Sequence, residues 1–175
     1  MNANRYGFID WGITHVTTVQ QGSISEAAVE YAVLPAGGVA GALFSGWASD
    51  RFFHGRRAPV IVGLLVALAL LTLVYHRAVL AGLLPTVLVL VAVGFTLFGA
   101  QVMLVGTAPV DLSRPGTQAA AVGFVNFTGY MGAYAGDLVT GRIADVHGWS
   151  AAVDFWAVCA GVAAISAALL WNRRG

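Results

Sequence analysis

The chain has 175 residues, of which 58% are hydrophobic and only 10% are charged. Soluble domains carry about 25% charged residues, so this composition excludes a soluble domain and indicates an integral membrane protein. The formal net charge is +1, all nine basic residues are arginine, and we expect no nucleic-acid partner.

The expected helices follow from apolar runs of about 20 residues, the length that spans a bilayer. The first run, residues 1 to about 20, is interrupted by Arg5 and Asp10 and is too short to span alone. We interpret it as the end of a longer helix whose beginning is missing. Further helices are expected at about 26–49, 58–75, 85–106, 117–141 and 150–171. The predicted fold class is all-α: a polytopic transmembrane helix bundle of about six helices, with the first one truncated.

The second and third expected helices differ in character. The second contains Pro35 and the spaced glycines Gly37 and Gly41, which predict a kink and the close approach of a neighbouring helix. The third has Thr72 as its one polar side chain. That profile is typical of a helix that faces lipid.

A basic loop, Gly46–Arg57, joins these two helices. Arginines so close together, beside chain too apolar to fold in water, must lie in the polar layer at one membrane surface. We expect Asp50 and Arg51 to close a helix end, and Gly55 to allow a tight turn before Arg56. The alternative is that a short loop between spans collects arginines without a further role.

The distribution of arginines predicts the orientation. If the 51–57 loop is cytoplasmic, the 111–116 loop and the C-terminus are cytoplasmic too. Two arginines, Arg77 and Arg142, then lie outside, which satisfies the positive-inside rule. The arginines gathered inside are Arg51, Arg56, Arg57, Arg114, Arg173 and Arg174.

The fifth expected helix carries a polar stripe. At about 100° per residue, Asn126, Tyr130, Tyr134 and Asp137 lie on one face. Polar groups are costly in hydrocarbon, so the stripe should face protein or a water-filled path. The alternative is that the tyrosines are interfacial aromatics and Asn126 bridges helices. The adjoining face is expected to pack on another helix through Gly129, Gly132 and Gly136.

The basic loop also carries a family resemblance. Its pattern, G-x-x-x-D-R followed closely by G-R-R, looks like the signature loop in each half of major facilitator superfamily transporters. Three residues separate Arg51 from Gly55 where one is usual, and this longer spacing resembles the organophosphate:phosphate antiporters.

Three further runs resemble the same family, and the overall match extends in order over essentially the whole chain. Arg5–Trp11 resembles the end of the seventh helix of the glycerol-3-phosphate transporter group. Gly94–Gly106 is similar to its tenth helix, and Gly123–Gly132 looks like its eleventh. The resemblance implies that this chain is the C-terminal half of a twelve-helix fold.

The resemblance also implies a substrate site. Arg5 matches the arginine that reaches the substrate phosphate, and Tyr130 matches a tyrosine near the same site; Asn126 joins them as a candidate from the polar stripe. Two expected tyrosines are absent, because Phe98 and Asn2 stand at their positions. The organic part of a substrate can therefore differ from glycerol phosphate.

The implied activity is secondary active transport, in which an organophosphate such as glycerol 3-phosphate or a sugar phosphate is exchanged for inorganic phosphate by alternating access. The basic loop would hold the cytoplasmic gate through Asp50 and Arg51. The expected partners are the small anionic organophosphate, inorganic phosphate, membrane lipid, and a missing N-terminal half or companion chain. The expected location is the bacterial inner membrane, with a cytoplasmic C-terminus.

Two other interpretations remain open: a membrane sensor of sugar phosphates that does not transport, and a structural remnant or split half that needs a partner chain. Enzymatic activity is not expected. The sequence shows no nucleophile motif, no metal-ligand spacing and no nucleotide-binding glycine loop, so we expect no cofactor and no metal.

Overall fold

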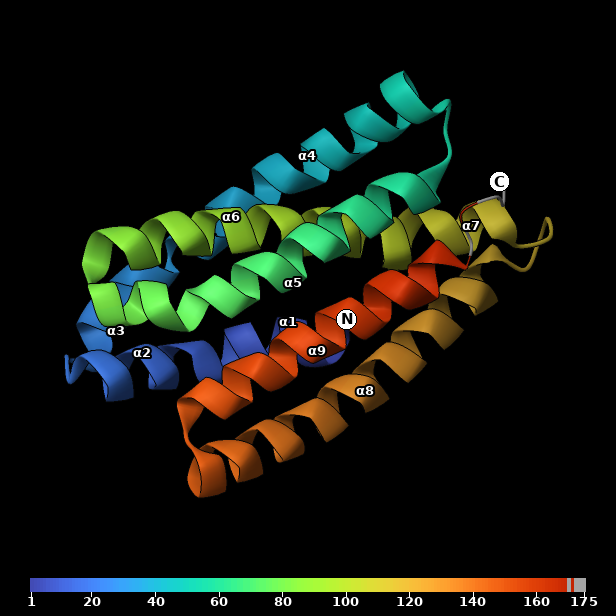
Figure 1. The fold of residues 1–175 in the computed structure, drawn as a ribbon. Coiled ribbons are helices and arrows are strands. Elements are labelled where there is room, and N and C mark those ends of the chain that lie inside the picture. The colour runs from blue at the N-terminus through green and yellow to red at the C-terminus, as the bar shows by residue number, and fades with distance from the viewer. Residues whose placement is uncertain (170, 172–175) are drawn as a thin grey trace.

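The computed structural model describes residues 1–169 and Trp171 (Figure 1). Within these residues the chain is helical and contains no strand, which confirms the predicted all-α class. The helical segments are α1 (Asn2–Tyr6), η1 (Gly7–Trp11), α2 (Gly12–Gln20), α3 (Ile24–Tyr31), α4 (Val33–Phe53), α5 (Arg57–Ala81), α6 (Leu83–Gln101), η2 (Val102–Thr107), α7 (Ala108–Leu112), α8 (Gln118–His147) and α9 (Trp149–Ala168).

Some of these segments are continuous: α1, η1 and α2 form one long helix, and α6, η2 and α7 form another. The bundle therefore consists of a few long helices that lie side by side (Figure 1). The described residues contain four stretches long and apolar enough to cross a membrane: Ile24–Phe53, Arg57–Ala81, Leu83–Leu112 and Trp149–Ala168. The chain is therefore a multi-pass membrane protein. The helix α8 has 30 residues, as many as the longest of these stretches, but it also contains Asn, Tyr and Gly residues among its apolar side chains.

The helix ends differ from the expected ones at positions where polar residues predict a boundary. The helix α5 continues past Tyr75, through His76 and Arg77, and ends at Ala81. The backbone turns only at Gly82, whose φ of +107° favours glycine. Polar side chains at a membrane surface do not interrupt backbone hydrogen bonds, so they are poor markers of a helix end. The expected last helix reached residue 171; the described α9 ends at Ala168, and residues 170 and 172–175 lie outside the described part.

The helices α4 and α6 are in backbone contact. A Cβ atom added at Gly37 would overlap the carbonyl oxygen of Val91, and one at Gly41 would overlap that of Phe95. The contact is reciprocal, because a Cβ atom at Gly94 of α6 would overlap the carbonyl of Leu34 on α4. Small residues are the general means by which membrane helices approach this closely.

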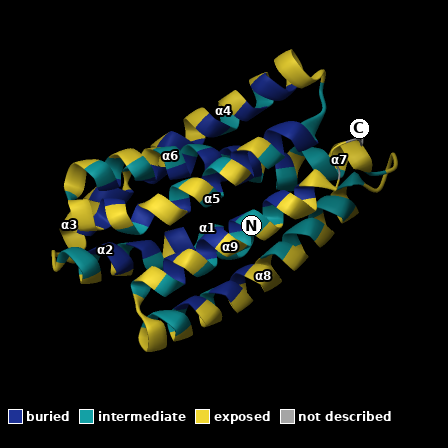
Figure 2. Ribbon diagram, in the orientation of Figure 1, coloured by how far each residue is buried: buried dark blue, intermediate teal, exposed yellow. Residues whose placement is uncertain are grey.

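The helix α5 does not simply face lipid, as its composition suggested. One side, which includes Leu65, Leu68 and Tyr75, is fully buried against α9 and α6. The opposite side, which includes Leu70, is exposed (Figure 2). Both sides are apolar, so the sequence pattern could not distinguish the packed face from the exposed one.

A buried polar cluster joins α2, α3 and α5 at the end of the bundle away from the basic loop. The ring of His15 is fully buried; its Nδ1 lies 3.1 Å from the Tyr75 hydroxyl and its Nε2 lies 3.0 Å from Nδ1 of His76. The Tyr75 hydroxyl is also hydrogen-bonded to the hydroxyl of Tyr31. Buried polar groups require partners, so this cluster fixes how the three helices meet.

Candidate functional site

The candidate site is centred on Arg5, at the end of α1. Its guanidinium carbon lies 4.9 Å from the centroid of the Tyr6 ring and 5.8 Å from that of Phe98 on α6. The Tyr6 ring in turn lies 6.1 Å from the ring of Tyr130 on α8. Three helical segments therefore bring one cation and three aromatic rings together.

The packing of α1 determines where Arg5 points. The side chain of Asn4 is fully buried and donates a hydrogen bond of 2.9 Å to the carbonyl of Trp156 on α9. The indole of Trp156 donates to the Thr140 hydroxyl on α8, also at 2.9 Å. Gly7 allows this arrangement, because a Cβ atom there would lie 2.6 Å from the Trp156 ring. The neighbouring Arg5 is consequently carried by a helix anchored to both α8 and α9.

The guanidinium group of Arg5 has unused hydrogen-bonding capacity. Its Nε atom is buried and has no hydrogen-bond partner among the described residues, and neither salt bridge of the described part involves it. The guanidinium group lies over the Tyr6 and Phe98 rings, and a ring face does not occupy the in-plane N–H donors as an acceptor atom would. A guanidinium in this state is suited to binding a carboxylate or phosphate.

The other residues of the polar stripe are less closely connected to Arg5. Tyr130 reaches the site through Tyr6, but its side chain and that of Tyr134 are 56% and 64% exposed. Asn126 is half-buried, and no hydrogen bond joins it to Arg5 within the described part of the chain. One carboxylate oxygen of Asp137 is buried without a partner among the described residues.

The glycines of α8 divide into two groups. A Cβ atom at Gly129 would overlap the side-chain amide of Asn2, and one at Gly136 would lie 2.5 Å from the Cβ of Ala3. Both glycines therefore lie against α1. A Cβ atom at Gly132 would meet nothing within 4 Å, so no described helix packs against Gly132, and its expected role in helix packing stays a prediction.

The basic loop is organised around Arg57. Its Nη1 atom lies 2.9 Å from Oδ1 of Asp50 and 3.1 Å from the Ser49 hydroxyl, and its Nε atom lies 3.1 Å from Oδ2 of Asp111. Arg51 is exposed and forms no salt bridge with a described residue. Asp50 therefore binds Arg57 and not its sequence neighbour Arg51, and α4 continues past both residues to Phe53. The role of Asp50 and Arg51 in a gate stays a prediction.

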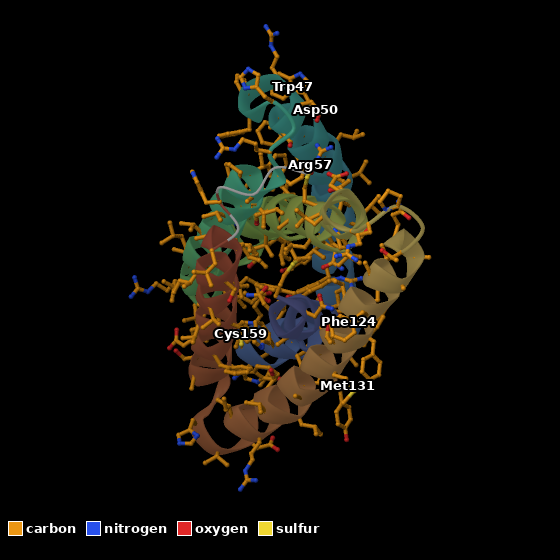
Figure 3. All side chains as sticks on the ribbon, turned by 90° about the vertical axis from the view of Figure 1, so that its right-hand side faces the viewer. Trp47, Asp50, Arg57, Phe124, Met131 and Cys159 are labelled. Carbon is orange, nitrogen blue, oxygen red and sulfur yellow. The ribbon has the colours of Figure 1, made fainter. Side chains whose placement is uncertain are left out.

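Glycines in the loop have unequal roles. The chain reverses at His54 and Gly55, whose φ angles are +52° and +80°, and Arg56 follows in an extended conformation. Gly55 therefore does allow the turn. Gly46 is not required by packing, since a Cβ atom there would meet nothing within 4 Å. Figure 3 shows Asp50 and Arg57 close together at this end of the bundle.

Sequence reasoning missed Asp111, which joins α7 to the ends of α4 and α5. A signal was available: Asp111 is one of few acidic residues at the end of the bundle that collects arginines. Because no local spacing links residue 111 to the loop, its partner became visible only in the folded chain.

Replacing Asp111 by Asn is expected to lower the apparent melting temperature of the detergent-solubilised chain by about 2–4 °C. The pair is partly exposed, so its loss should cost about 1 kcal/mol. The matched control is Asp145→Asn, at an exposed residue that forms no salt bridge with a described residue. Both variants should melt alike in about 1 M salt, where the pair is screened. Equal melting at low salt would show that Asp111 does not stabilise this end.

The described residues contain no group of three or more His, Cys, Asp or Glu side chains that could hold a metal ion. At the Arg5 site, the guanidinium group itself is suited to the reversible binding of an anion.

Comparison with known proteins gives a consistent family. Residues 8–175 match the model of the Major Facilitator Superfamily. The chain is 31% identical over 169 residues to the glycerol-3-phosphate transporter of Bacillus subtilis (strain 168), covering 96% of this chain and 38% of that protein. It is also 31% identical to the membrane sensor protein UhpC of Escherichia coli (strain K12), covering 92% of this chain and 36% of the sensor.

A third relative is the probable hexose phosphate transport protein of Chlamydia pneumoniae, at 28% identity, with 93% of this chain and 36% of that protein covered. The chain thus spans less than two fifths of the length of these relatives. By their names, the relatives are transporters and a sensor, not enzymes. With its helical bundle and its basic loop, the chain belongs to the major facilitator superfamily.

Proposed function

We propose that the chain is the C-terminal half of a secondary active transporter that exchanges an organophosphate for inorganic phosphate. The observation that carries this proposal is the Arg5 guanidinium, which is held between Tyr6 and Phe98 with a buried Nε atom that has no partner among the described residues. A phosphate offers several oxygens to such a planar set of donors, and an arginine stays charged when partly buried.

The proposal requires a complementary half. A phosphate dianion carries two charges, and one guanidinium compensates only one of them, so we expect a second cation from the missing half. The exposed side of α8 is suited to face that half across the site: Figure 3 shows Phe124 and Met131 pointing away from the bundle, and Phe127, Tyr130 and Tyr134 are also exposed. Transporters of this kind bind substrate near mid-membrane between their two repeats.

The two ends of the bundle would then serve as alternating gates. We propose that the arginine-rich end lies on the cytoplasmic side of a bacterial inner membrane. At this end, Arg57 links α4 to α7 through Asp50 and Asp111. Rocking of the two halves would open and close this end while the substrate neutralises Arg5. The substrate would lower the barrier to closing, because an unoccupied pair of arginines repels.

A sensor of sugar phosphates is the second candidate function. The chain has the same identity, 31%, to the sensor UhpC and to the Bacillus subtilis transporter. A sensor needs the same anion site, but its binding energy would bias a signalling contact and would not drive exchange.

The test is exchange in proteoliposomes that contain this chain assembled with an N-terminal half. Vesicles loaded with radioactive phosphate should release it when glycerol 3-phosphate or glucose 6-phosphate is added outside, and should retain it in buffer alone. Saturable binding of either organophosphate without release would support the sensor. Neither binding nor release would reject both functions and leave the structural remnant.

A further inference from the structure

The basic loop forms a hollow that is not lined by the ion-paired residues Asp50, Arg57 and Asp111. Its walls are Phe52, Phe53, His54 and Arg56, and its volume is about 390 Å³. Three of these residues, Phe52, Phe53 and His54, occupy the lengthened spacing between Arg51 and Gly55. The left-handed conformations of His54 and Gly55 turn the chain so that these side chains surround one space.

The charges around the hollow favour an anion. Arg57 is neutralised by Asp50 and Asp111, whereas neither Arg51 nor Arg56 forms a salt bridge with a described residue. The Nη2 atom of Arg56 donates to the carbonyl of Trp171 at 3.1 Å, and its Nε atom is buried without a partner among the described residues. The N-terminus of α5 begins at the next residue without a side-chain cap, which adds positive potential.

Aromatic rings lie beside this positive region. The Trp47 and Phe52 rings pack edge to face with centroids 5.2 Å apart, and the rings of Phe44 and Trp47 lie 5.9 Å apart. Trp47 and Phe52 are 55% and 59% exposed, and the exposed Leu43 continues the apolar surface along α4. Figure 3 shows Trp47 near Asp50 and Arg57 at the same end of the bundle.

The position of the hollow matches the headgroup layer. The helix α5 has 25 residues and begins beside the hollow. At 1.5 Å per residue it extends about 37 Å, longer than the roughly 30 Å of bilayer hydrocarbon. Its end at Arg57 therefore reaches the polar layer, and exposed Trp side chains are characteristic of that depth.

We propose that the hollow lined by Phe52, Phe53, His54 and Arg56 binds the phosphate diester of an anionic phospholipid. The Arg51 and Arg56 guanidinium groups attract the headgroup, and an acyl chain lies along Trp47 and Leu43. A free phosphate ion would use the charges but gain nothing from the exposed rings, so the ligand is the lipid. This site is separate from Arg5, and it is independent of whether the protein transports or senses.

The test compares two double variants of the purified chain by native mass spectrometry, with phosphatidylglycerol and phosphatidylcholine of equal chain length. Each arginine near a membrane surface contributes somewhat less than a factor of about 10 to the affinity for an anionic lipid. The double variant Arg51→Gln with Arg56→Gln should therefore weaken phosphatidylglycerol binding about 30-fold. The matched control, Arg77→Gln with Arg142→Gln, removes the same charge at exposed residues away from the loop and should bind as the unaltered chain does.

Two further measurements keep the proposal falsifiable if the loop variant does not fold. In the unaltered chain, phosphatidylglycerol with brominated acyl chains should quench the Trp47 component of fluorescence, defined by difference from Trp47→Phe, more than brominated phosphatidylcholine does. Millimolar inorganic phosphate should not displace the lipid. Equal quenching by the two lipids, equal losses in the two double variants, or displacement by inorganic phosphate would each overturn the proposal.

Discussion

Replacing Gly41 by Ala is expected to lower the apparent melting temperature of the detergent-solubilised chain by about 5–10 °C, since overpacking costs about 1–3 kcal/mol and more where nothing can move. The added methyl group would overlap the carbonyl oxygen of Phe95 on α6. That atom belongs to a hydrogen-bonded helix backbone and cannot rotate away as a side chain would. The helices α4 and α6, which share the most extensive contact in the bundle, would have to separate.

The matched control is Gly46→Ala, on the same helix, where a Cβ atom would meet nothing within 4 Å. Alanine has the higher helix propensity, so this variant should melt at the same or a slightly higher temperature. Melting can be followed by the fraction of monodisperse protein that survives heating. If both variants behave alike, helix propensity and not the α4–α6 approach determines the outcome.

The second large effect is expected from Arg5→Lys. In the assembled transporter, kcat/KM for phosphate exchange should fall about 10- to 100-fold, the equivalent of one charge-assisted hydrogen bond. Lysine retains the positive charge, but it presents a point charge where the guanidinium presents a planar set of donors. It also lacks the Nε donor that is buried without a described partner in this structure.

Exchange should be measured in proteoliposomes with radioactive phosphate, with Arg142→Lys as the control for an exposed arginine elsewhere on the chain. The melting temperature of Arg5→Lys should stay close to that of the unaltered protein, because Arg5 forms no salt bridge with a described residue. Unchanged exchange in Arg5→Lys would remove Arg5 from the mechanism, even if the protein transports phosphate.

In the basic loop, the local sequence pattern predicts the turn but not the ion pairs. The left-handed turn at Gly55 was predictable, because a short connection between helices needs a residue that tolerates positive φ. The ion pairs were not, since Asp50 has Arg51 beside it in sequence but Arg57 beside it in space. Asp111 joins them from another helix, and no spacing rule connects residues so distant in the chain.

The candidate site shows the same division. Arg5 and Tyr130 were identified through a family resemblance, and among the described residues the Tyr6 ring connects them. Sequence reasoning had not assigned Tyr6 to the site. Their roles in substrate binding stay predictions. The buried cluster of His15, Tyr31 and Tyr75 was missed altogether, because each residue appears as an isolated polar side chain in an apolar run.

The sequence by itself determined that this is a helical membrane protein of a transporter family and approximately where four apolar spans lie. Hydrophobicity and turn residues act locally, and bilayer thickness imposes the length of each span. Only the tertiary structure decided which face of α5 is buried, which carbonyls Gly37 and Gly41 approach, and which carboxylates Arg57 binds. These outcomes depend on the rotation and register of one helix against another. In a uniformly apolar helix, no periodic pattern specifies that rotation, so backbone approach and a few buried polar contacts must do so.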